Sequence, residues 1–92
     1  MEIRINALKF TATEAQLDFI KKKVKRLERI VPAGEAEADV TLSLQNESKK
    51  VVLKLAGNII ERTTDTFENS ITAAVDAMKE KIVREKEKAA GR

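Results

Sequence analysis

Apolar and polar residues alternate over the first ten positions, which predicts a strand from Glu2 to Phe10. Its apolar residues change parity half-way, and a bulge near Asn6 and Ala7 would bring them all onto one face. These residues are Ile3, Ile5, Leu8 and Phe10. We therefore expect an N-terminal strand with one apolar face in the core.

Apolar residues then recur at spacings of three and four, the period of a helix with one buried stripe. This stripe consists of Leu17, Ile20, Val24, Leu27 and Val31. Thr13 is a good N-cap, and Gln16 three residues later completes a capping box. We expect a helix over residues 14–30, which Pro32 and Gly34 end.

The middle of the chain returns to the alternation of strands. Apolar and polar residues alternate strictly over residues 36–45, which predicts a strand with one buried face and one solvent-exposed face. A turn at residues 46–48 leads to a strand over residues 50–55. A tight turn at Gly57–Asn58 then leads to a strand over residues 59–64. Short turns between consecutive strands indicate an antiparallel meander.

A last apolar stripe predicts a second helix. The stripe consists of Phe67, Ile71, Ala74, Val75, Met78 and Ile82. The helix is expected to begin at Asp65 or Thr66, with Glu68 in the capping-box position relative to Asp65. Almost no apolar anchor follows Ile82, so we expect the C-terminal tail to fray from about residue 87.

The order β-α-β-β-β-α predicts an α+β fold. Each element is amphipathic on one side, so two helices packed on one face of a four-stranded sheet is the economical arrangement. The chain has 92 residues and no internal repeat or linker, which indicates a single domain over residues 1–92. The expected core consists of Ile3, Ile5, Leu8, Phe10, Leu17, Ile20, Val24, Leu27, Val40, Leu42, Leu44, Val51, Leu53, Ile71, Val75 and Met78.

The composition removes several kinds of chemistry. The chain has no cysteine and no histidine, hence no disulfide, thiolate nucleophile or imidazole base. Glu37 and Asp39 share a strand face, where solvated carboxylates are commoner than an acid–base pair, and no spacing supports a carboxylate-only metal site. No glycine-rich phosphate loop is present. We expect no enzyme activity, cofactor or small-molecule substrate.

Membrane association is not expected either. No apolar run approaches the length of a membrane span, and no apolar signal region precedes the first strand. The basic segments lack the aromatic residues that interfacial helices favour. We expect a soluble cytoplasmic protein.

The net charge of +3 hides an uneven distribution. Residues 21–29 carry six basic residues and one acid, and residues 79–92 carry six and three. Residues 30–78 carry four basic residues and eight acids. Positive charge confined to two helical segments is typical of a surface that binds a polyanion.

On the first helix, four basic residues fall within about one quadrant of a helical wheel, opposite the buried stripe. These residues are Lys22, Lys25, Arg26 and Arg29. A solvated face that only aids solubility is the competing interpretation. The surface lacks aromatic residues, which argues against stacking on single-stranded bases. Lysine and arginine without stacking partners contact phosphates, so folded RNA is the favoured ligand.

Taken in order, several stretches resemble the ribosome hibernation-promoting factor family, also called ribosome-associated inhibitors or sigma-modulation proteins. They are EIRINALKF, LDFIKKKVKRLER, ADVTLSL, KKVVLKL and TFENSITAAVDAMKEKIVREKEK, and together they span residues 1 to about 88. No single motif is specific, but their joint order and spacing are.

The resemblance implies the same β-α-β-β-β-α architecture and binding to the small ribosomal subunit and its rRNA, in the channel of mRNA and tRNA. Occupying that channel would block translation and preserve idle ribosomes under stress. The family's basic positions correspond to the four residues of the first helix and to a set on the second. On the second helix the matching residues are Lys79, Arg84, Lys86 and Lys88, and Lys81 between them completes the expected rRNA-binding set.

Some positions depart from the family's pattern. The family often has a basic residue where Glu80 stands, glutamine where Lys81 stands, and basic residues near Val83 and Glu85. The resemblance is to the short form, so we expect no additional domain of the kind with which long members pair ribosomes. Off the ribosome we expect a monomer.

Two other functions stay open at this point. A protein-interaction module that modulates a transcription sigma factor would use the same basic helices against an acidic protein, and an enzyme is a weaker third. Co-sedimentation with ribosomal subunits favours ribosome binding, and capture of a polymerase without such co-sedimentation favours the sigma-factor interaction.

Overall fold

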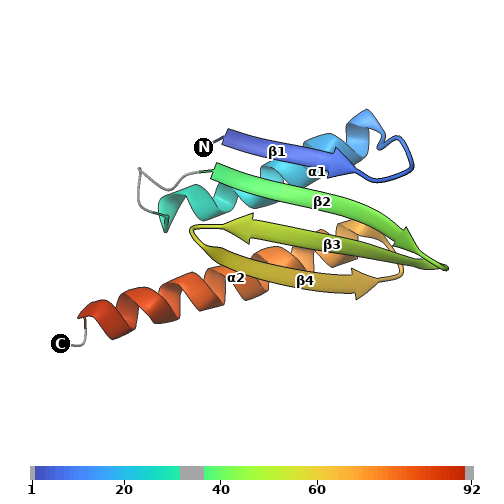
Figure 1. The fold of residues 1–92 in the computed structure, drawn as a ribbon. Helices are drawn as coiled ribbons and strands as arrows, with labels where there is room; N and C mark the ends of the chain where they lie inside the picture. Colours follow the sequence, from blue (N-terminus) through green and yellow to red (C-terminus); the bar gives the residue numbers. More distant parts are fainter. Residues whose placement is uncertain (1, 32–36, 91–92) are drawn as a thin grey trace.

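The computed structural model describes residues 2–31 and 37–90, with side chains described as far as Lys86. The elements follow in the expected order, with a short 3₁₀ helix after the first α-helix (Figure 1). They are β1 (Glu2–Ala7), α1 (Glu14–Lys25), η1 (Arg26–Arg29), β2 (Glu37–Gln45), β3 (Ser48–Leu55), β4 (Asn58–Thr64) and α2 (Phe67–Ala90). The predicted α+β fold is confirmed.

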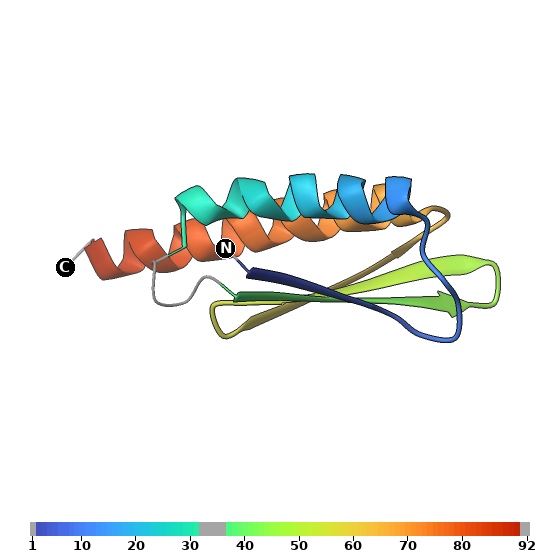
Figure 2. The same cartoon turned by 90° about the horizontal axis from the view of Figure 1, so that it is seen from above.

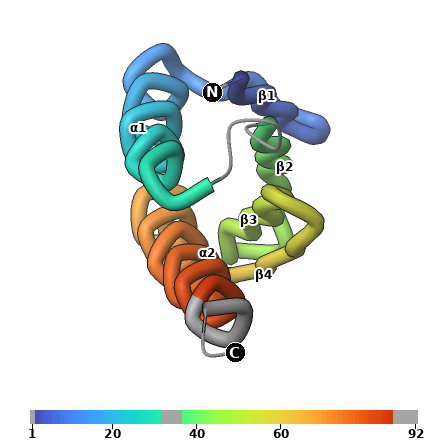
Figure 3. The backbone as a smooth tube through the Cα atoms, turned by 90° about the vertical axis from the view of Figure 1, so that its left-hand side faces the viewer, coloured from blue at the N-terminus to red at the C-terminus, as the bar shows by residue number. Residues whose placement is uncertain are grey.

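Within the described residues, four strands form one mixed sheet in the order β1-β2-β3-β4. β1 pairs parallel with β2, and β3 pairs antiparallel with β2 and with β4. Because parallel neighbours need a crossover, α1 connects β1 to β2 across the sheet. Figures 2 and 3 show α1 and α2 side by side on one face of the sheet. None of the described elements covers the opposite face, and β1 and β4 are the edges.

The core lies between the helices and the covered face of the sheet. Its buried residues are Ile20, Val24, Leu27, Val31, Ala38, Val40, Leu42, Val51, Leu53, Leu55, Phe67, Ile71, Ala74, Val75, Met78 and Ile82. Ile3, Ile5 and Phe10 are half-buried against this cluster, and Leu17 is half-buried on α1. The Phe10 ring stacks on Phe67 with centroids 5.2 Å apart, which joins the segment after β1 to the start of α2.

For two residues, the prediction that they belong to the core is wrong. Leu8 is 44% exposed, because β1 ends at Ala7 and Lys9 has a φ of 62°. The strand therefore stops where a bulge was expected. Leu44 is 48% exposed although its parity matches buried Leu42. It lies at the end of the β2–β3 hairpin that extends beyond both helices, so neither described helix covers it (Figure 1).

The hairpin turn between β3 and β4 is one residue earlier than predicted. Ala56 and Gly57 form it, with φ of 52° and 77°, and Leu55 pairs with Asn58. Positive φ at both turn residues matches the right-handed twist of the flanking strands. Asn58 is buried, and its Nδ2 donates to Ala56 O and to Glu85 Oε2 on α2, each at 3.4 Å.

The first helix begins as predicted. Gln16 N donates to Thr13 Oγ1 and Thr13 N donates to Gln16 Oε1, which confirms the capping box. The α-helix ends at Lys25, and the 3₁₀ helix η1 completes the predicted span to about residue 30. Pro32 and Gly34, the predicted stop signals, lie outside the described residues.

The second helix is capped by Thr66. Asn69 N donates to Thr66 Oγ1 at 3.1 Å, so the capping residue lies one position after Asp65. The predicted capping box between Asp65 and Glu68 is therefore wrong. Asp65 instead accepts a bond from the Asn69 side chain. The helix continues to Ala90, and fraying of its end in solution stays a prediction.

Candidate nucleic-acid interface

Five basic residues line one open hollow between the end of the first helix and the middle of α2. The hollow has a volume of about 780 Å³. Its lining consists of Lys22, Lys25, Arg26, Glu28, Arg29, Ile30 and Lys79. All four basic residues predicted on the first helix therefore gather at one place, and Lys79 of α2 joins them.

The change from α1 to η1 arranges the two arginines of the hollow. Residues three apart are eclipsed in a 3₁₀ helix, so Arg26 and Arg29 project along one line. Leu27, between them, is 1% exposed and fixes η1 against the core. The basic residues are thus attached to a buried support while their own side chains are exposed.

The cations of the hollow are not neutralised by the described part of the protein. Among the described residues, none of the five forms an ion pair with a carboxylate. Glu28 is the one acid among the described lining residues. Five cations around one acid, held on α1, η1 and α2, produce a positive potential that attracts a polyanion and requires little reorganisation on binding.

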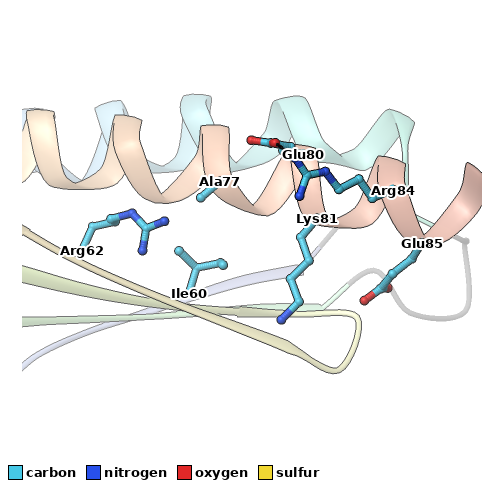
Figure 4. Close-up of a pocket in the computed structure, with 7 residues that line it drawn as sticks. All are labelled: Ile60, Arg62, Ala77, Glu80, Lys81, Arg84 and Glu85. Atoms are coloured by element: carbon cyan, nitrogen blue, oxygen red, sulfur yellow. Dashed lines mark hydrogen bonds and ion pairs between the residues drawn. The ribbon is translucent and has the colours of Figure 1, made fainter.

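The basic residues of α2 are divided between its two flanks. Lys86, seven residues after Lys79, returns to the flank that faces α1, about two turns further along. Lys81 and Arg84 lie on the opposite flank, in a second hollow beside β4 (Figure 4). Of the basic residues predicted on α2, Lys79 therefore lines the hollow together with the first-helix set, whereas Lys81 and Arg84 line the second hollow. The side chain of Lys88 lies outside the described residues.

The second hollow is electrostatically different from the first. Arg84 forms an ion pair with Glu80 one turn before it, and Glu85 accepts a hydrogen bond from Asn58. Arg62 reaches the hollow from β4 and was not predicted. A signal was available in the sequence, because Arg62 has the same parity on β4 as Ile60, which packs against the core.

The uncovered face of the sheet carries paired charges. Arg4 Nε donates to Asp39 Oδ1 at 2.9 Å and lies near Glu37, and Lys50 pairs with Glu61. Glu37 and Asp39 are thus solvated, ion-paired strand residues.

Among the described residues no group of three or more potential ligands is placed to hold a metal ion. None of the described helices combines the length and apolar character needed to cross a membrane.

Comparison with known proteins identifies the family. Residues 3–90 match the family model described as "Sigma 54 modulation protein / S30EA ribosomal protein". The chain belongs to this family. The resemblance found in the sequence is thereby confirmed.

Solved structures of similar fold agree with this membership. The N-terminal domain of Protein Y from Thermus thermophilus is 28% identical, with a TM-score of 0.77, over 91% of this chain and 98% of that one. A ribosomal subunit interface protein from Coxiella burnetii shares the fold at 18% identity and a TM-score of 0.74, over 94% and 98% of the two chains. Among curated proteins, none matches the sequence.

Proposed function

We propose that this S30EA-family protein binds the small ribosomal subunit by placing rRNA phosphates in the hollow between η1 and α2. The observation that carries the proposal is the gathering of five cations, unpaired within the described residues, around that hollow. The family's description as a ribosomal protein supports a ribosomal partner. The protein would act without catalysis and in the cytoplasm, where ribosomes are.

The chemistry of the hollow favours the phosphate backbone over bases. Arginine and lysine bind phosphate oxygens, and arginine does so with two parallel hydrogen bonds. The described lining contains no aromatic side chain on which a base would stack. The protein would therefore recognise the shape of folded rRNA.

From this binding we infer the effect on translation. A rigid domain seated in the channel of mRNA and tRNA would exclude both, and the subunit would stay idle and protected, as the family resemblance implies. The hollow would face the wall of that channel, and the uncovered sheet face, with its paired charges, would face away from it.

Co-sedimentation with small subunits tests the proposal. The key variant changes Lys22, Lys25, Arg26 and Arg29 to glutamine, and we expect it to lose co-sedimentation and inhibition of in vitro translation. The matched control changes Lys9, Lys21, Lys49 and Lys54 to glutamine, which removes the same charge outside the hollow. Equal behaviour of the two folded variants, or wild-type protein that does not sediment with subunits, would reject the proposal.

A sigma factor is the second candidate partner, because the family's description also includes modulation of sigma 54. The same hollow would then contact an acidic protein surface. Binding to purified polymerase holoenzyme, with no binding to subunits under the same salt conditions, would favour this function.

A further inference from the structure

The edge strand β4 has the geometry of a peptide-binding edge. Among the described strands it has no neighbour on its outer side. Leu55 and Asn58 flank a two-residue turn, so alternate pairs along β3 and β4 exchange hydrogen bonds. The residues between those pairs direct their backbone N–H and C=O groups away from β3. These residues are Ile59, Glu61 and Thr63.

A hollow runs beside this edge on the helix-covered side. Its volume is about 470 Å³. Its lining consists of Ile60, Arg62, Ala77, Glu80, Lys81, Arg84 and Glu85. Figure 4 shows Arg62 and Ile60 projecting from β4, with Lys81 extending from α2 toward the strands. A strand added to β4 would direct every second side chain into this space.

The charges in the hollow select an acidic occupant. Both of its acids are already engaged, Glu80 by Arg84 and Glu85 by Asn58. Among the described residues, Lys81 and Arg62 have no carboxylate partner. A carboxylate on the groove side of an added strand would therefore meet two available cations.

One outward backbone group of β4 already has a hydrogen-bond partner within the chain, and an added strand would replace that partner. Arg62 Nη1 donates to the backbone oxygen of Glu61 at 2.7 Å, and this carbonyl is one of the outward groups. An added strand supplies a backbone N–H to the same oxygen, which releases the guanidinium toward an acidic side chain. On the uncovered face, Ile59 is 58% exposed and gives the strand an apolar contact.

We propose that β4 binds an extended acidic segment of a partner protein as a fifth strand. The site lies on the flank of α2 opposite the rRNA-binding hollow, so it does not depend on the proposed function. A second copy of the chain fits poorly, because full-length antiparallel pairing of two β4 strands sets Glu61 opposite Glu61. Partner binding and rRNA binding would thus use separate faces of one domain.

The test is an NMR titration of the whole chain with a short synthetic peptide of alternating valine and glutamate. We expect amide shifts along β4 and near Lys81, and slower exchange of the Glu61 amide. Arg62→Gln with Lys81→Gln should weaken binding by about three- to tenfold, the effect of losing two exposed charge pairs. Lys9→Gln with Lys21→Gln, the matched control, should leave the affinity unchanged.

Four peptide results would overturn the proposal. One is the absence of shifts on β4, and another is shifts centred on Lys22 to Arg29, which would indicate attraction to the rRNA-binding hollow alone. The third is equal binding of a valine–lysine peptide, and the fourth is equal binding of a valine–glutamate peptide with proline in place of its central residues. Neither peptide matches the site. A short rRNA hairpin that shifts the β4 amides would assign this edge to RNA instead. Failure on any of these grounds leaves subunit co-sedimentation, and so the proposed function, untouched.

Discussion

Ser70 connects three elements through one buried hydroxyl. It is 0% exposed and lies in the first turn of α2. Its Oγ donates to Lys49 O on β3 at 2.7 Å and accepts from Thr64 N on β4 at 3.0 Å. These bonds satisfy backbone groups at the ends of two strands while they fix the start of the helix.

Replacing Ser70 by alanine should lower the free energy of unfolding by about 1–3 kcal/mol, because a buried donor and a buried acceptor lose their partner. Urea denaturation followed by circular dichroism measures the change. The control is Ser43→Ala, at a half-buried position of β2. We expect it to change the free energy of unfolding by less than about 0.5 kcal/mol. Equal midpoints for Ser70→Ala and wild type would show that the Ser70 hydroxyl contributes nothing to stability.

At the scale of elements, the β3–β4 turn stores strain in one residue. Ala56 has a φ of 52°, in the left-handed region that non-glycine residues other than asparagine and aspartate rarely adopt. Gly57 follows with a φ of 77°, and a Cβ built there meets nothing within 4 Å. The backbone of this turn therefore favours an Asn-Gly pair.

Ala56→Asn should raise the free energy of unfolding by about 0.5–1 kcal/mol, because asparagine tolerates positive φ better than alanine. Gly57→Ala is the opposite case and should lower it by about 1 kcal/mol through backbone strain alone, since there is space for the methyl group. Thermal unfolding of both variants beside wild type measures the difference. A stabilised Gly57→Ala, or a destabilised Ala56→Asn, would mean that the turn differs from the one described.

The sequence predicted the elements well because their periodicities are strong. The strict alternation before Gln45 and the stripe from Leu17 to Val31 required no knowledge of tertiary structure. Parity alone, however, does not tell how far a helix covers a strand. The face of the strand on which Leu44 lies was therefore predicted correctly, but its burial was not.

The candidate site was predicted in part for a related reason. The basic set on the first helix follows from its own period, and the structure keeps all four residues together. Whether a lysine of α2 lies near the cations of the first helix depends on which flank of α2 packs beside α1. The sequence of one helix alone does not determine that flank. Lys79 and Lys81 are two residues apart and consequently line different hollows. Arg62 was missed because it is isolated in an acidic part of the sequence.

At the scale of the whole molecule, the fold separates the basic surface from the core that supports it. The sheet and the buried stripes supply stability, and α1, η1 and α2 carry the exposed cations over them (Figure 2). Removing these exposed charges leaves every core contact in place. The proposed ribosome-binding surface can therefore be changed without unfolding the protein, so its contribution to ribosome binding can be measured separately from stability.

The most direct measurement is the salt dependence of binding to small ribosomal subunits. Each phosphate contact lowers affinity by roughly the 0.7–0.9 power of salt concentration, so about five contacts should give a loss of two to three orders of magnitude for a fourfold increase in salt. Changing Lys22, Lys25, Arg26 and Arg29 together to glutamine should reduce the logarithmic slope by about 3. The control that changes Lys9, Lys21, Lys49 and Lys54 should keep the wild-type slope, with circular dichroism confirming that both variants fold. An unchanged slope for the hollow variant would contradict the account and leave the basic residues of the hollow as a solubility device.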